Sequence, residues 1–137
     1  GLTSTAPDYA RFVQMMLRGG ELGGNRLLQA DTVAEMARNQ VAPLRAGAMG
    51  SAMPALAQPY DTFPDQHTGW GLGFLINPET GPHGRSPGSL AWAGIFNSYY
   101  WIDPVAGVGG VFMSQHAPFG DAGAPACFGA LEQLAYG

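Results

Sequence analysis

The sequence has 137 residues, of which 46% are hydrophobic and only 12% are charged, and its formal net charge is −4. This length is enough for one globular domain, and the absence of a basic cluster gives no electrostatic reason to expect DNA, RNA or an anionic membrane as a partner. This charge distribution instead favours a small uncharged or weakly charged ligand. No apolar run approaches the roughly 20 residues that span a bilayer, so we expect no membrane span.

The basic and sulfur-containing residues add further limits. All six basic residues are Arg, and no Lys occurs in the sequence. The single Cys127 excludes an internal disulfide, and we expect it to be a small buried residue on a helix rather than a nucleophile. Because Gly1 opens without Met, a basic segment or an apolar leader, the start is expected to be an interior point of a longer protein.

A first helix is predicted to begin after Thr5, in a capping box with Pro7 in the first turn and Asp8 three positions after the cap. Gly19-Gly20 supplies the stop. An apolar stripe at helical spacing, which we interpret as core, consists of Tyr9, Phe12, Val13, Met16 and Leu17.

Two further elements are predicted before residue 40. Gly23-Gly24 favours a tight turn between two short extended arms. A second helix is predicted from about Asp31 to Arg38, with Gln29 as a poor cap. Its inner face is expected to contain Val33, Met36 and Ala37.

The segment from Val41 to Thr68 has no regular hydrophobic period, and four prolines interrupt it. A connection of this length is usually a functional flap or a mobile segment. We therefore expect it to be a loop rather than part of the core.

The second half of the chain predicts an antiparallel meander and a closing helix. The expected strands are Trp70–Ile76, Ser89–Trp92, Ser98–Ile102 and Val108–Ser114. The helix has Pro125 in its first turn, and its apolar face is expected to contain Ala126, Cys127, Ala130, Leu131 and Leu134. The fold class predicted from these elements is α+β, with a three- to four-stranded antiparallel sheet packed with helices.

Several motifs resemble those of one protein family and occur along the chain in the same order as in that family. They are Gly1–Phe12, Gly19-Gly20-Glu21-Leu22, Met36–Gln40, Gly71-Leu72-Gly73-Phe74, Trp92-Ala93-Gly94, Trp101-Ile102-Asp103-Pro104 and Met113-Ser114-Gln115. With these motifs, the chain resembles the class C β-lactamase-related family over nearly its whole length. The resemblance implies a serine hydrolase with the β-lactamase/transpeptidase fold of penicillin-binding proteins, similar to family VIII carboxylesterases.

In that family, catalysis uses the Ser of a Ser-x-x-Lys motif, a Tyr-x-Asn or Ser-x-Asn motif, and a Lys/His/Trp-x-Gly strand. Without any Lys the first motif is absent here, and no Tyr is followed two positions later by Asn. A Ser hydroxyl is a weak nucleophile without a nearby base. We therefore expect residues 1–137 to be a single C-terminal portion of a truncated β-lactamase-like domain, inactive by itself.

The resemblance also implies which part of the active site this chain contains. Trp92-Ala93-Gly94 stands where β-lactamases have Lys-Thr-Gly, and the backbone N–H of Ile95 would complete the oxyanion hole. Trp92, Gly94 and Ile95 are thus the catalytic candidates, and Ala93 and Gln115 are the substrate-binding candidates. Because Trp replaces a cation that would hold a β-lactam carboxylate, the resemblance favours an esterase.

Simpler interpretations stand beside these. Trp92 could be an ordinary core side chain, and Gln115 an ordinary amide at a strand end. His67, His83 and His116 are far apart and lack ligand spacing, so we expect neither a metal site nor a cofactor. No Gly-x-Ser-x-Gly motif occurs. Asp8 is expected to cap a helix and Asp103 to end a strand.

Two functions remain open from the sequence. In the first, the full-length parent is a serine hydrolase acting on a small ester or β-lactam. In the second, the chain is a non-catalytic binding or assembly module with the same scaffold. A chain without its upstream segment would expose a bare sheet edge, so self-association through that edge is also expected.

Overall fold

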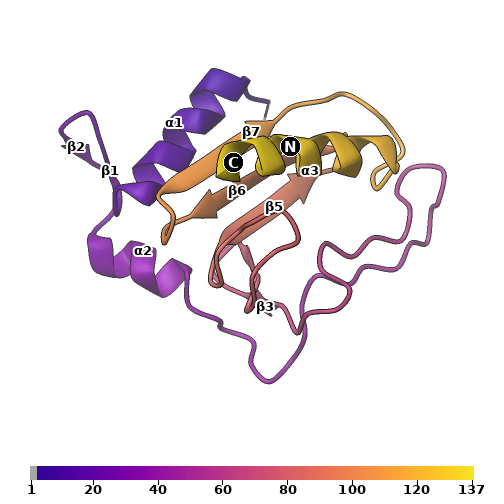
Figure 1. Ribbon diagram of the computed structural model, residues 1–137, viewed down its shortest axis with the longest axis horizontal. Helices are drawn as coiled ribbons and strands as arrows, with labels where there is room; N and C mark the ends of the chain where they lie inside the picture. The colour runs from indigo at the N-terminus through magenta and orange to yellow at the C-terminus, as the bar shows by residue number, and fades with distance from the viewer. Residues whose placement is uncertain (1–2) are drawn as a thin grey trace.

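The computed structural model describes residues 3–137, so Gly1 and Leu2, where the first family motif begins, lie outside the described residues. The described chain forms one five-stranded antiparallel sheet, a two-stranded hairpin and three helices (Figure 1), which confirms the predicted α+β class. In chain order the elements are α1 (Ala6–Leu17), β1 (Glu21–Leu22), β2 (Asn25–Arg26), α2 (Ala30–Met36), β3 (Gly69–Trp70), β4 (Leu75–Ile76), β5 (Leu90–Gly94), β6 (Ser98–Asp103), β7 (Val108–Phe112) and α3 (Gly123–Tyr136).

The ends of α1 follow the sequence prediction. The Thr5 side chain accepts a hydrogen bond from the Asp8 N–H at 3.3 Å, as a cap should. Beyond the helix, Gly19 and Gly20 have φ angles of 62° and 95°, and their N–H groups donate to carbonyls of the last helical turn. Glycine adopts this left-handed conformation without steric cost, so the pair ends the helix.

The hairpin and α2 are also close to prediction. Gly23 and Gly24 both have positive φ in the turn between β1 and β2. Gln29 makes no side-chain hydrogen bond at the N-terminus of α2, which confirms it as a poor cap. The helix ends at Met36, two residues before the predicted Arg38.

The single strand predicted over Trp70–Ile76 is wrong, because this stretch is two short strands, β3 and β4, that pair with each other. The turn between them is closed by a hydrogen bond from the Gly71 N–H to the Phe74 oxygen at 2.8 Å, and Gly73 has a φ of 96°. Alternating Gly and apolar residues look like a strand in the sequence, but these glycines allow a reversal. The split gives the sheet five strands instead of three or four.

The rest of the meander forms as predicted, with the strand order β3-β4-β5-β6-β7. β5 pairs with β6 over the whole length of β5, from Leu90 opposite Ile102 to Gly94 opposite Ser98. β6 then pairs with β7 down to Asp103 opposite Val108. Asp103 therefore ends a strand, as expected.

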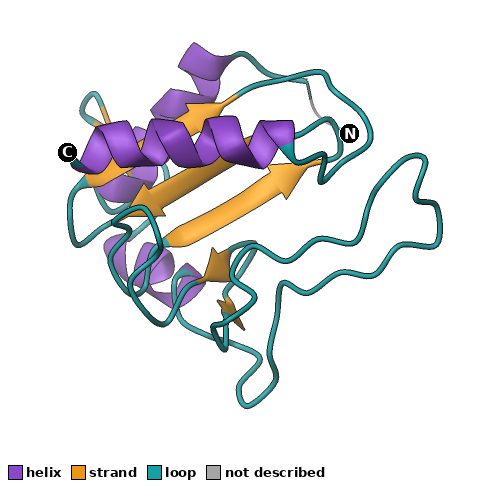
Figure 2. Cartoon of the chain, turned by 45° about the vertical axis from the view of Figure 1, so that its right-hand side comes forward, coloured by secondary structure: helices purple, strands orange, loops and turns teal. Residues whose placement is uncertain are grey.

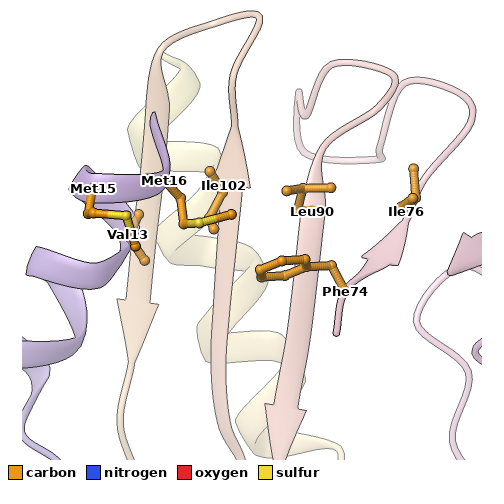
Figure 3. Packing of buried hydrophobic residues seen from close by; sticks show 7 residues of the cluster. All are labelled: Val13, Met15, Met16, Phe74, Ile76, Leu90 and Ile102. Carbon is orange, nitrogen blue, oxygen red and sulfur yellow. The ribbon is translucent and has the colours of Figure 1, made fainter. Parts of the chain in front are cut away.

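Two apolar cores lie on opposite faces of the sheet, because successive side chains of a strand alternate between its faces. The first core joins α1 to the sheet through Val13, Met15, Met16, Phe74, Ile76, Leu90 and Ile102 (Figure 3). The other members of the predicted α1 stripe and the inner face of α2 pack against it. The second core contains Ala91, Tyr99, Trp101, Phe119, Ala124 and Phe128.

The predicted buried face of α3 is wrong except for Leu131, which is partly buried and packs against the second core. Cys127, Ala126, Ala130 and Leu134 are exposed, and the exposed fraction of Leu134 is 82%. The helix, which crosses one face of the sheet in Figures 1 and 2, instead buries Ala124, Phe128, Gly129 and Glu132. A buried Glu on the inner face is the feature that an apolar pattern could not include.

Residues 41–68, called the tongue below, double back on themselves and extend away from the body of the molecule (Figure 2). A short antiparallel bridge joins Met49 to Tyr60 across the tongue. Near its base, Arg45 forms an ion pair with Asp61 at 2.6 Å and donates to the Gln66 oxygen at 2.8 Å. The tongue is thus braced by hydrogen bonds of its own and by backbone hydrogen bonds to Phe119, rather than by regular strands.

Candidate active site

The end of β5 has one unpaired edge. β4 begins at Leu75, opposite Ala91, so no strand pairs with Trp92, Ala93 or Gly94 on the side away from β6 within the described chain. The turn at Gly71–Phe74 causes this gap, because it leads the chain away from β5 towards α2. The predicted site strand therefore has a backbone edge that an extended ligand group can reach.

The side chains of this edge leave room beside the strand. The Trp92 ring is half-buried and meets the ring of Trp70 edge to face, with centroids 4.5 Å apart. Gly94 is exposed, and a Cβ placed there would meet only Ser98, at 3.9 Å. Trp92 is thus one wall of the edge, packed against the hairpin of β3 and β4, and Gly94 leaves the strand end open.

The turn after β5 presents a backbone donor. Ile95 is 45% exposed, and within residues 3–137 its backbone N–H donates no hydrogen bond. The turn is closed instead by the Asn97 N–H, which donates to the Gly94 oxygen at 2.9 Å. A free N–H at a strand end is the kind of group that an oxyanion site needs, and the role of Ile95 in such a site stays a prediction.

Asn97 is a site residue that the sequence analysis missed. It is fully buried, has a φ of 60°, and makes four hydrogen bonds through its side chain. It donates to the oxygens of His116 and Pro118, both at 2.8 Å, and accepts from the Tyr99 hydroxyl and the Gly120 N–H, both at 2.9 Å. The available signal was an Asn before a strand, since Asn tolerates positive φ better than most residues.

These bonds attach the segment after β7 to the turn. The Ser114 hydroxyl donates to the Phe96 oxygen at 2.6 Å, and the His116 N–H donates to the same oxygen at 3.2 Å. Gln115 stands between these two anchors, and its side chain is exposed. The structure thus brings Gln115 next to the turn that carries Ile95, and its contact with a substrate stays a prediction.

The tongue and β5 enclose a small hollow beside the unpaired edge. Ala91, Trp92 and Ala93 line it from β5, and Met49 and Tyr60 line it from the tongue. Burial raises the pKa of Tyr60 above its usual value, and only weaker contacts, including one with Thr62, oppose this. The phenol therefore stays neutral at physiological pH and adds no charge to the hollow.

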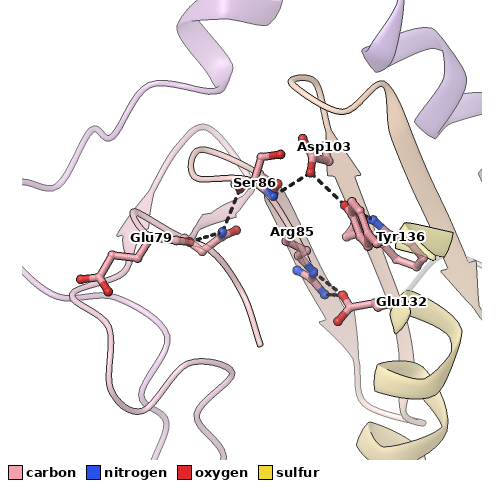
Figure 4. A network of polar contacts seen from close by, with 9 residues as sticks. Glu79, Arg85, Ser86, Asp103, Glu132 and Tyr136 are labelled. Atoms are coloured by element: carbon pink, nitrogen blue, oxygen red, sulfur yellow. Dashed lines mark hydrogen bonds and ion pairs between the residues drawn. The ribbon is translucent and has the colours of Figure 1, made fainter. Parts of the chain in front are cut away.

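A polar network lies at the opposite end of β6 (Figure 4). Arg85 and Glu132 are buried and form an ion pair, and the guanidinium also lies over the rings of Phe63 and Phe128, at 5.5 and 5.3 Å from their centroids. Burial lowers the pKa of Arg85 to about 10, so it remains charged at neutral pH. This network holds α3 to the loop before β5 and is far along β6 from the unpaired edge.

Asp103 completes that network. Burial alone would raise the pKa of its carboxyl group, but hydrogen bonds from the N–H groups of Ala106 and Ser86 and from the Tyr136 hydroxyl hold this pKa below its usual value. Tyr136 in turn accepts a hydrogen bond from the Trp101 indole at 3.0 Å. Asp103 therefore has a structural role, as the sequence suggested.

The remaining polar candidates do not converge on one another. His67 contacts the Pro43 oxygen at 2.9 Å, and His116 lies 3.5 Å from Asp121 on the surface. Within residues 3–137, no three His, Cys, Asp or Glu side chains are grouped so that they could hold a metal ion. In the same part of the chain, no helix has the length and apolar character needed to cross a membrane.

Comparison with known proteins shows which family and which proteins the chain is similar to. A family model described as Beta-lactamase matches residues 1–131, which is nearly the whole chain. An acyltransferase of Penicillium decumbens, calJ, is 30% identical over 127 residues, which are 88% of this chain and 29% of that protein. The chain spans less than a third of the length of the curated relatives it matches.

Solved structures agree in fold. The unliganded simvastatin synthase LovD of Aspergillus terreus has a TM-score of 0.73 at 24% identity, and the match covers 93% of this chain and 32% of that one. A β-lactamase of Mycobacterium bovis has a TM-score of 0.63 at 25% identity, and the match covers 97% of this chain and 45% of that one. The first of these shows the fold alone, and both are considerably longer chains.

Proposed function

The chain belongs to the Beta-lactamase family, and on this premise we propose that it is the C-terminal portion of a serine hydrolase of esterase or β-lactamase type. It supplies the oxyanion side of the active site, and an upstream segment supplies the nucleophile and its base. The substrate of the whole enzyme is a small ester or β-lactam, and we favour the ester.

The observation that carries this proposal is the unpaired end of β5. An acyl group lying along Trp92–Gly94 would meet no strand on that side. The Ile95 N–H, which has no partner in residues 3–137, is available to donate to the oxygen that becomes negative when the carbonyl is attacked. Gly94 lets the substrate lie close to the backbone, because no side chain intervenes.

The side chains of residues 1–137 determine which catalytic roles this portion takes and which the upstream segment takes. Formation of an acyl-enzyme requires a base that removes the Ser proton, and the family uses Lys and Tyr for this. The chain contains no Lys and no Tyr-x-Asn motif. Its contribution is therefore orientation and stabilisation of charge, through Trp92, Gly94 and Ile95, with Ala93 and Gln115 beside the substrate.

Hydrolysis of p-nitrophenyl acetate tests this proposal. We expect no turnover above the buffer rate with the 137-residue chain alone, and turnover with a longer protein from the same gene that carries Ser-x-x-Lys and Tyr-x-Asn upstream. Turnover by the chain alone would refute the division of labour. An open reading frame without those motifs would favour the alternative, a non-catalytic binding or assembly module.

A matched pair of variants connects the activity to β5. In the longer enzyme, Gly94→Val places a branched side chain on the open strand end and should lower kcat at least about tenfold, because loss of one positioning contact typically has this size. Ala126→Val adds a comparable side chain to the exposed surface of α3 and is the control. Equal activity of the two variants would place the substrate elsewhere.

The chain taken alone has a second unpaired edge, on β7. Within the described residues no strand pairs with Val108–Phe112 on the side away from β6, and no charged residue or proline interrupts this stretch. Such an edge favours pairing with another chain. We therefore propose self-association of the isolated chain, and a monodisperse monomer at all concentrations in light scattering would contradict it.

A further inference from the structure

The hollow between the tongue and β5 has the composition of a binding site for an apolar group. Its walls include the side chains of Met49, Tyr60 and Phe119 and the methyl groups of Ala91 and Ala93. None of the residues that line it carries a formal charge. It lies beside the part of β5 where the strand edge is unpaired. An apolar group attached to a substrate on that edge could thus enter the hollow.

The size of the hollow limits what can enter. Its volume is about 10 Å³, and a cavity of this size holds only one small group, comparable with a water molecule. A buried water needs two to four polar partners, which walls made largely of methyl groups and aromatic rings supply poorly. A methyl group needs none, so the hollow suits a methyl group better than water.

The walls are braced, so they can select by size. The Met49 N–H donates to the Tyr60 oxygen at 2.9 Å, and the Tyr60 N–H donates back to the Met49 oxygen at 3.0 Å. The Phe119 N–H donates to the Leu56 oxygen at 2.9 Å, which fixes the tongue to the segment held by Asn97. The small side chains on β5 are what leave the space open, and Met49 limits it from the other side.

We propose that this hollow is a subsite for a methyl-sized group of the substrate, formed by Met49 and Tyr60 of the tongue against Ala91 and Ala93 of β5. The inference rests on the proposed function and narrows the substrate class to esters with a short, unbranched acyl group, acetyl above all. Met49 and Ala93 are its specificity-determining residues.

Binding to the chain itself can be tested without turnover, by NMR of ¹³C-methyl-labelled methionines. Methyl acetate should shift the Met49 methyl signal to saturation and leave that of Met53, which is 65% exposed on the same tongue, unchanged. Methyl pivalate, whose tert-butyl group is too large, should shift neither signal. The Ala93→Leu variant should abolish the effect, whereas Ala126→Leu on the exposed face of α3 should preserve it. Equal shifts of Met49 and Met53, or none, would overturn the subsite.

A second measurement uses the longer enzyme and does not depend on the stability of the isolated chain. We expect the ratio of kcat/KM for p-nitrophenyl acetate to that for the butyrate to fall about tenfold in Met49→Ala, because added methylenes are worth factors of this size in a fitted pocket. Met53→Ala should leave the ratio unchanged. An unchanged ratio in Met49→Ala overturns the subsite. If the unaltered enzyme hydrolyses neither ester, the proposed function fails, and the NMR titration still decides the subsite.

Discussion

The two ends of β6 are built in opposite ways. At its Asp103 end, the sealed end, Arg85, Glu132, Asp103 and Tyr136 form a buried network in which charged groups are paired (Figure 4). At its Ser98 end, the open end, β5 is unpaired on one side, Gly94 has free space beside it, and a backbone N–H has no partner in residues 3–137.

The difference separates what holds the fold from what is available to a ligand. Arg85 and Glu132 are paired at the sealed end, and Asp103 and Tyr136 are hydrogen-bonded to each other, whereas Nη1 of Arg85 has no partner in the described residues. Removal of one member of these pairs should therefore cost stability. At the open end, the Ile95 N–H has no partner in residues 3–137 and β5 is unpaired on one side. Changes there should therefore cost binding or catalysis instead of stability. Asn97 is the exception, because it lies at the open end but is buried like the sealed end.

The largest loss of stability is expected for Glu132→Ala, because this change leaves the buried Arg85 charge unpaired. Breaking a buried pair from one side costs about 3–5 kcal/mol of unfolding free energy, which urea denaturation monitored by circular dichroism would measure. The double variant Arg85→Met/Glu132→Leu should recover most of the loss, since no lone charge remains. A matched control is Glu35→Gln, which breaks the exposed pair with Arg38 and should change stability by less than about 0.5 kcal/mol.

Substitution of Asn97 tests whether the open end is held in place by a buried, fully hydrogen-bonded residue. Asn97→Ala removes four hydrogen bonds and leaves at positive φ a residue that tolerates this conformation less well than Asn, so we expect a loss of about 3 kcal/mol. Asn97→Gly removes the same bonds but tolerates the conformation, and should lose about 1 kcal/mol less. Thermal unfolding compares the two, and equal losses would mean that the backbone conformation is unimportant.

Several elements of the fold could be predicted from local sequence signals. The capping box at Thr5, the paired glycines after α1 and the aromatic strand β6 each fix local structure by their own chemistry, and each was found where predicted. The division of Trp70–Ile76 into two strands depends on a contact with α2, where a Cβ at Gly71 would lie 2.1 Å from the Met36 oxygen. No pattern within the segment reports such a contact.

The polar network of the sealed end could not be predicted from the sequence, for a similar reason. An apolar pattern assigns Glu132 to solvent, yet it is buried because Arg85, 47 residues earlier, reaches it. At the open end, Trp92–Ile95 came from a family motif and Asn97 from no motif at all. Three of the four hydrogen-bond partners of Asn97 are in a segment about 20 residues away, so its role could be recognised only in three dimensions.

Acid should weaken the sealed end through Asp103. Its pKa is held below the usual 3.8 in the folded chain, so it contributes stability that is present above the unfolded pKa and is lost as pH falls through the folded value. Asp103→Asn should cost about 1–2 kcal/mol at neutral pH, because a charged acceptor is replaced by a neutral one. The variant and the parent chain should converge in urea denaturation as pH falls below 3.8 and through the folded value. A difference that stays constant throughout this acid range would show that the charge is irrelevant.

The smallest effect on stability should come from the residue with the greatest proposed importance for function. Gly94→Ala adds a methyl group where the nearest atoms are 3.9 Å away, so we expect a change within about 0.5 kcal/mol. Gly110→Ala is the matched control on β7, since its Cβ would lie 2.2 Å from the Trp101 ring and should be strongly destabilising. In the longer enzyme, Gly94→Ala should nevertheless lower kcat, because the added methyl group occupies the face that the substrate approaches. A stable variant with full activity would show that the open end is merely unfilled, and the contrast between the two ends would then have no functional meaning.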